Sequence, residues 1–166
     1  MDGQPLTSGD VAFTARLIQE FKLPGLSSRW TGVTRIDTPD EATVVFQLKK
    51  PFATFLNRTL EVPIVPAHIW EPIAAAARQS EKPLAALLNH EIQNPVGCGP
   101  YVLKEWRRGG YLYLEKNPLF FGTGLTIGGQ ALGPYIKGML FKIYTTTDVA
   151  MLALRKGDID IFMQHI

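Results

Sequence analysis

The sequence predicts an α+β fold, in which helices and antiparallel strand pairs occupy separate stretches of the chain. Three observations predict it: apolar residues recur at helical spacing near residue 10, apolar and polar residues alternate along residues 33–37 and 43–47, and a second alternating pair follows at 101–106 and 111–115. The chain has 166 residues, of which 46% are hydrophobic and 19% charged. A chain of this size and composition can bury a core as one domain or as two small ones.

The first helix is predicted to begin at Thr7 and to end before Pro24. The Thr7 side chain can accept a hydrogen bond from the backbone near Asp10, and the Asp10 carboxylate suits the positive end of the helix dipole. One face of this helix carries Val11, Thr14, Ile18 and Phe21.

Each pair of alternating segments surrounds residues that favour a tight turn. Pro39-Asp40-Glu41 joins the first pair, and Arg108-Gly109-Gly110 joins the second. We therefore expect two antiparallel hairpins, one in each half of the chain.

The stretch between the hairpins is predicted to hold only short helices. Four prolines from Pro51 to Pro72 exclude a long helix there, because proline lacks a backbone N–H and clashes with the preceding turn. Pro72 and Pro83 suit the first turns of two short helices, over residues 73–78 and 84–90.

The segment from Asn94 to Pro100 is the strongest break in the chain, because it combines two prolines with two glycines. It predicts a domain boundary that divides the chain into residues 1–97 and 98–166. The Gly-rich stretch 122–133 is expected to be too irregular to form an element.

The end of the chain is predicted to form a βαβ-like unit. A strand is expected over 136–144, a helix over 147–156 and a further strand from Ile159. Two strands joined by a helical crossover usually lie parallel.

The residues predict no metal site, no cofactor and no nucleic-acid partner. The histidines His68, His90 and His165 are far apart, and none has a Cys, Asp, Glu or His partner at a metal-ligand spacing. Residues 122–127 imitate the opening of a dinucleotide fingerprint but lack its third glycine, so a flexible loop explains them better. A formal net charge of +2 supplies no field strong enough to recruit nucleic acid.

Two other classes of function stay open from the residues alone. A hydrolase or transferase domain would need His68 or Cys98 in a pocket beside a base, although no nucleophile elbow is present in the sequence. A structural or protein-interaction domain would instead have a closed surface without a ligand cleft. Cys98 is the single cysteine, so an internal disulfide is impossible.

Four groups of residues follow one another in a recognisable order. They are DGQPLTSGDVAFT at 2–14, DEATVVFQL at 40–48 with IVPAHIW at 64–70, PVGCGPY at 95–101, and GDID at 157–160. In this order and spacing they resemble the family 5 extracytoplasmic solute-binding proteins, the peptide, dipeptide and nickel receptors of ABC importers. The resemblance covers nearly the whole chain.

The resemblance implies part of a type II periplasmic-binding-protein fold. Residues 1–97 would be a small α+β domain with an antiparallel hairpin, and residues 98–166 part of an α/β binding lobe that ends at the hinge. It also implies a signal or lipoprotein segment before the chain and a large lobe after it. We therefore expect the chain to bind its ligand poorly when alone.

By the same resemblance, the whole protein would trap a peptide or related small solute between two lobes and present it to an ABC transporter permease in the membrane. No chemical conversion is expected. The implied location is periplasmic or extracellular, and a lipid anchor is compatible with it. Ser28, Arg29 and Trp30 after the first helix, and Gln164 and His165 at the hinge end, are the predicted ligand-binding residues. A packed core aromatic is the alternative for Trp30, and a solvated surface residue is the alternative for Arg29.

Overall fold

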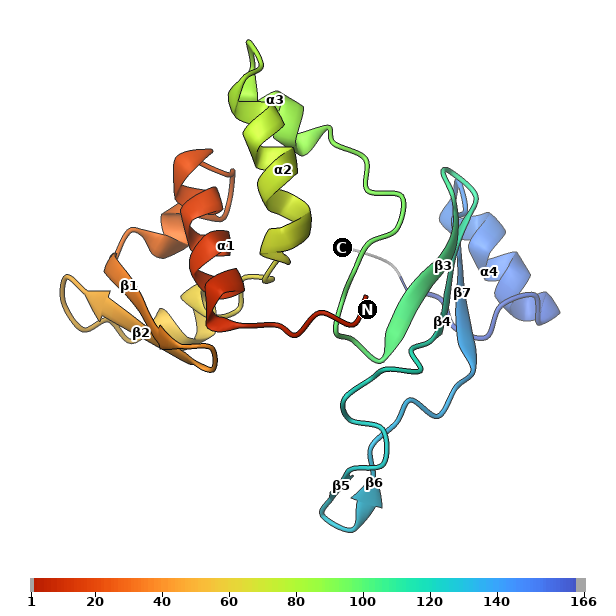
Figure 1. Ribbon diagram of the computed structural model, residues 1–166. Helices are drawn as coiled ribbons and strands as arrows, with labels where there is room; N and C mark the ends of the chain where they lie inside the picture. The colour runs from red at the N-terminus through yellow and green to blue at the C-terminus, as the bar shows by residue number, and fades with distance from the viewer. Residues whose placement is uncertain (1, 164–166) are drawn as a thin grey trace. The chain divides into compact units, whose positions relative to one another are not determined.

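A computed structural model describes residues 2–163 (Figure 1), and they divide into two compact units. The N-terminal unit comprises residues 3–93, and the C-terminal unit comprises the residues from 94 onward together with Asp2. Whether they are the two domains predicted from the sequence stays a prediction.

The N-terminal unit is built around α1, Ser8–Glu20, which lies between the other helices and a hairpin (Figure 1). One side of α1 buries Phe13, Leu17 and neighbouring apolar side chains against α2, Ala67–Arg78, and α3, Pro83–Leu88. Another side buries Ala15 and Ile18 against Trp30, Val33 and Val62. The predicted first helix is therefore confirmed, and it buries more than the single face that the periodicity indicated.

The first hairpin is also confirmed, but its predicted turn is displaced: Pro39 and Asp40 belong to the first strand, and the turn is Glu41-Ala42. Strand β1, Val33–Asp40, pairs antiparallel with β2, Thr43–Leu48, from Val33 opposite Leu48 to Asp40 opposite Thr43. Two short helical turns flank it, η1 at Ser27–Trp30 and η2 at Phe55–Thr59.

The predicted start of the next helix is wrong, because α2 begins at Ala67 and contains Pro72 in its interior. Proline at that position removes one hydrogen bond to the carbonyl four residues earlier, and sequence rules therefore place it at a helix start. The helix forms nevertheless, because Ala74 and Ala77 are buried against α1 and α3, and tertiary packing outweighs the missing bond. Pro83 does open α3, as predicted.

The C-terminal unit contains a three-stranded antiparallel sheet with the strand order β3, β4, β7. Its strands are β3 at Tyr101–Arg107, β4 at Tyr111–Lys116 and β7 at Gly138–Lys142. The predicted second hairpin is the β3–β4 pair. Helix α4, Thr147–Lys156, follows the sheet over the predicted range.

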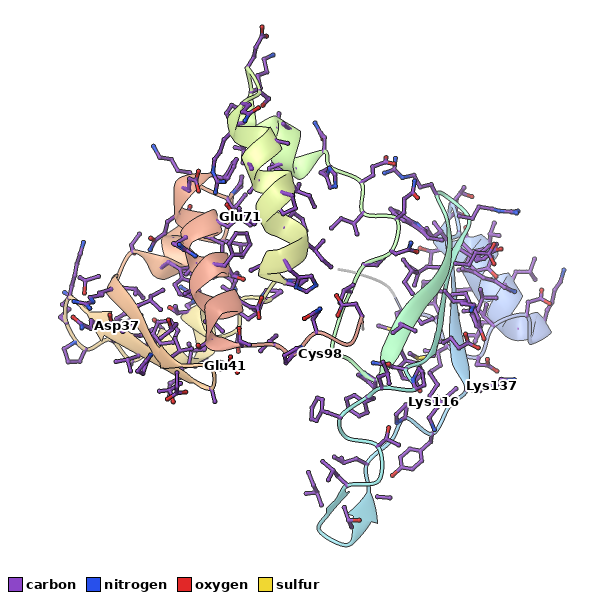
Figure 2. All side chains as sticks on the ribbon, in the orientation of Figure 1. Asp37, Glu41, Glu71, Cys98, Lys116 and Lys137 are labelled. Atoms are coloured by element: carbon purple, nitrogen blue, oxygen red, sulfur yellow. The ribbon has the colours of Figure 1, made fainter. Side chains whose placement is uncertain are left out.

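Two predictions in this unit are wrong. The Gly-rich stretch does form an element, a small hairpin of β5, Thr126–Ile127, and β6, Gln130–Ala131. Its turn is Gly128-Gly129, whose positive φ angles of 59° and 82° are those that a tight two-residue hairpin requires. The labelled side chains of Lys116 and Lys137 mark the base of this excursion (Figure 2), where Lys116 N–H donates to the Lys137 carbonyl at 2.9 Å.

The second error concerns the parallel βαβ unit. Residues 159–163 form no strand, and β7 pairs antiparallel with β4 instead. A strand needs a neighbour to pair its backbone N–H and C=O groups, and no described strand pairs with the segment after α4.

Candidate functional site

The described residues include three of the five predicted ligand-binding residues, all on η1. Ser28 and Arg29 are exposed at the surface. Trp30 is only 1% exposed and packs in the core, with its ring 5.9 Å from that of Phe46, and its indole N–H has no hydrogen-bond partner among the described residues. Gln164 and His165 lie outside the described residues. The role of these five in ligand binding stays a prediction.

Ser28 and Arg29 line a surface depression of about 460 Å³ in the N-terminal unit. We call it the basic pocket, because Lys49, Lys50 and Arg58 line it together with Arg29. Sequence reasoning missed Lys49, Lys50 and Arg58, since they come from segments that only the fold brings next to η1. The adjacent pair Lys49-Lys50 at the end of a predicted strand was the one available signal.

A second depression, of about 550 Å³, lies on the sheet of the C-terminal unit. Tyr111 donates a hydrogen bond to the Glu105 carboxylate, and this bond, with burial, raises the pKa of Tyr111. The Arg107 guanidinium lies 5.5 Å from the centre of the Tyr111 ring. Leu140 and Ile143 complete an aromatic and aliphatic surface, which suits packing against another apolar group better than proton transfer.

In the N-terminal unit, hydrogen bonds join residues of the first motif to residues of the second. The buried Asp10 carboxylate accepts from Thr7 N–H at 2.8 Å, which caps α1, and from Ala67 N–H at 2.8 Å, which caps α2. Thr14 accepts from Val65 N–H at 3.0 Å and donates to the Asp10 carbonyl at 2.8 Å. Burial alone would raise the pKa of Asp10, but the Ala67 and Thr7 hydrogen bonds outweigh it and hold that pKa below its ordinary value.

The third motif is tied in a similar way in the C-terminal unit. Asn117 is 1% exposed, and its side-chain amide donates to the Gly99 carbonyl at 2.7 Å. Its backbone N–H donates to the Pro100 carbonyl at 2.9 Å, and its side-chain oxygen accepts from Leu119 N–H at 3.0 Å. One side chain thus joins the entry of β3 to the end of β4.

The fourth motif ends a helix. Gly157 has a φ of 77° and forms the left-handed C-cap of α4. The Lys142 ammonium donates to the Asp158 carbonyl at 2.9 Å, which fixes the segment after α4 to the end of β7. In all four motifs, the described contacts hold backbone segments together.

The described residues contain no group of three or more His, Cys, Asp or Glu that could hold a metal ion. His68 is exposed, and Cys98, labelled in Figure 2, is an exposed free thiol. Within residues 2–163, no helix combines the length and the apolar character that crossing a membrane requires.

Comparison with known proteins agrees with this scaffold. The family model of the bacterial extracellular solute-binding proteins, family 5 Middle, matches residues 1–165. Protein XP55 of Streptomyces lividans is 35% identical over 160 residues, which are 96% of this chain and 26% of that protein. The oligopeptide-binding protein AppA of Bacillus subtilis is 30% identical over 166 residues, which are 97% of this chain and 27% of that protein.

A solved structure shares the fold. The periplasmic oligopeptide-binding protein of Thermotoga maritima with bound mannohexaose has 28% sequence identity and a TM-score of 0.75, and the match covers 95% of this chain and 27% of that one. The α+β fold is therefore part of a type II periplasmic-binding-protein fold, as predicted.

The chain belongs to the bacterial extracellular solute-binding proteins of family 5. It spans about a quarter of the length of the curated relatives it matches.

Proposed function

We propose that the chain is part of an extracytoplasmic receptor that binds peptides or related small solutes and delivers them to an ABC transporter permease. Residues 1–97 would be its small α+β domain, and residues 98–166 part of a binding lobe. The receptor would act in the periplasm or outside the cell, with or without a lipid anchor, and it would not convert its solute.

The match of the family model to residues 1–165 carries this proposal. AppA is named as an oligopeptide-binding protein. The Thermotoga maritima protein is also named as an oligopeptide-binding protein, but its structure contains a bound oligosaccharide, mannohexaose. A peptide is therefore the first solute class to test and an oligosaccharide the second.

The surface of the C-terminal unit supports the proposal independently. Among its described residues the buried hydrophobic side chains are those of Ala150 and Ala153, and many large apolar side chains are exposed, among them Phe121, Ile127, Leu140, Ile143 and Leu152. Apolar surface of this extent marks a site where further protein packs. In a larger receptor lobe, further protein would pack on these apolar side chains and remove them from water.

The test uses the full-length protein that carries this chain. The protein is mixed with a library of peptides of two to nine residues and, separately, with a set of oligosaccharides. The bound solute is then recovered and identified by mass spectrometry. The proposal expects a solute retained by the protein and recovered unchanged. Recovery of hydrolysed or otherwise modified solute at a rate proportional to protein concentration would instead establish an enzyme.

A further inference from the structure

The N-terminal unit has no net charge, yet its cations gather in one place. Residues 3–93 contain nine acidic residues, at 10, 20, 37, 40, 41, 61, 71, 81 and 91, and nine Lys or Arg residues, at 16, 22, 29, 35, 49, 50, 58, 78 and 82. Their charges cancel, 9 − 9 = 0. Four of the nine cations, Arg29, Lys49, Lys50 and Arg58, line the basic pocket, and no acidic residue does.

Among the described residues, these four side chains have no carboxylate partner. The ion pairs of the N-terminal unit are formed by other cations. Arg35 pairs with Asp37 at 2.5 Å, and Arg78 pairs with both Glu20 and Glu71. The buried carboxylate of Asp10 is used by the two helix caps. Positive charge at the basic pocket is therefore not neutralised from within its own unit.

The backbone around the basic pocket is pinned by specific contacts. The buried Thr59 hydroxyl donates to the Arg29 carbonyl at 2.7 Å, which joins η2 to η1. Lys49 N–H donates to the Gly32 carbonyl at 3.0 Å, which joins the residue after β2 to the residue before β1.

The Phe52 ring also requires a glycine beside it. A Cβ atom added at Gly32 would lie 2.5 Å from the Phe52 ring, so glycine permits the ring to pack on the backbone there. Phe52 packs edge to face on Phe55 of η2, with the ring centres 5.6 Å apart. The three segments that carry the cations are thus held together before any ligand arrives.

We infer that the basic pocket binds the phosphate group of a small anion or of a lipid headgroup. Two guanidinium groups can each donate two parallel hydrogen bonds to a phosphate, and two ammonium groups add charge. Ser28 and Thr54 also line the pocket, and their hydroxyls can supply further donors. The Thr31 hydroxyl instead donates to the Ser28 carbonyl at 3.0 Å. A lone carboxylate would be satisfied by one guanidinium, whereas a phosphate dianion uses donors from several sides. This inference rests on the cations that line the basic pocket and does not depend on the proposed function, although Ser28 and Arg29 are also among the predicted ligand-binding residues.

The test compares two double variants of the 166-residue chain that remove the same charge from the same unit. Lys49→Gln with Arg58→Gln removes two cations from the basic pocket. Arg16→Gln with Lys82→Gln is the matched control, because both residues are exposed and neither lines the pocket. Circular dichroism verifies that both variants are folded. Binding of inorganic phosphate is measured by calorimetry, and binding to vesicles of phosphatidylglycerol in phosphatidylcholine is measured by sedimentation.

The inference expects wild type and control to bind at least about tenfold more tightly than the pocket variant. That pattern with inorganic phosphate identifies a free anion, and the same pattern with vesicles alone identifies a lipid headgroup. The inference is wrong if neither probe binds, or if both variants lose binding equally. It is also wrong if a hexaglutamate peptide binds more tightly than phosphate, because the partner would then be an acidic protein segment.

Discussion

At the scale of single residues, Asp10 joins two helices that begin 59 positions apart in the sequence, at Ser8 and Ala67. Its two carboxylate oxygens accept from Thr7 N–H, at the N-cap of α1, and from Ala67 N–H, in the first turn of α2, so one buried side chain satisfies two N–H groups that their own helices leave unpaired. The helix dipoles add to this stabilisation, because negative charge is favoured at a helix N-terminus.

Replacing Asp10 with alanine is expected to lower the free energy of unfolding by about 2 to 4 kcal/mol, because two N–H groups lose their acceptor at a buried position. Urea unfolding followed by circular dichroism measures the change. Asp37→Ala is the control: it removes a surface ion pair with Arg35 and is expected to cost less than about 1 kcal/mol. Equal losses for the two variants would contradict the assigned role of Asp10.

The lowered pKa of Asp10 predicts a pH dependence. Because its folded-state pKa lies below the unfolded value of about 3.9, its charge stabilises the fold above that value, and the stabilisation is lost as the pH falls through the folded-state pKa. The stability difference between wild type and Asp10→Asn should be constant from about pH 5 to 7 and should shrink below about pH 4. Urea unfolding midpoints of both proteins over that pH range measure this stability difference. A difference that grows as the pH falls would contradict the lowered pKa of Asp10.

At the scale of elements, the left-handed cap of α4 gives a further prediction. Gly157→Ala is expected to destabilise α4 by about 1 kcal/mol, because a Cβ atom is strained at a φ of 77°. Gly97→Ala is the matched control, since nothing lies within 4 Å of its added Cβ and its φ is not positive. Hydrogen exchange of the α4 amides measures both, and equal protection in the two variants would contradict the cap.

Elements with local signals were predictable from the sequence. Helix α1, both hairpins and α4 have their caps, turns or periodicity within a few residues of their own ends. The start of α2 was not predictable in this way, because its cap is the Asp10 carboxylate of another helix. The β5–β6 hairpin was missed because its strands have two residues each, which is too short for any alternation to be visible.

The candidate site was less predictable than the fold. The sequence predicted Ser28 and Arg29 after the first helix as ligand-binding residues. Both line the basic pocket, and their role in ligand binding stays a prediction. The other cations of that pocket come from the end of β2 and from η2, and only tertiary packing brings those segments together. For Trp30, the alternative of a packed core aromatic describes its surroundings, because pattern alone does not distinguish a buried tryptophan from an exposed one.

At the scale of the whole molecule, stability is expected to be unevenly distributed between the two units. Both hydrophobic core clusters of the described residues belong to the N-terminal unit, whereas in the C-terminal unit the buried apolar side chains of the core are Ala150 and Ala153. Amide exchange should therefore be slowest in α1 and clearly faster in β3, β4 and β7. Equal protection in the sheet and in α1 would mean that the exposed apolar surface is covered in solution.

The proposed function implies that this chain is a scaffold that needs the rest of a longer receptor to hold a solute. The most direct measurement is calorimetry with one peptide, first on the full-length protein and then on the 166-residue chain at the same concentration. We expect binding by the full-length protein and at least about a hundredfold weaker binding, or none, by the chain alone. Equal affinity of the two would contradict it, because the binding site would then lie entirely within these residues.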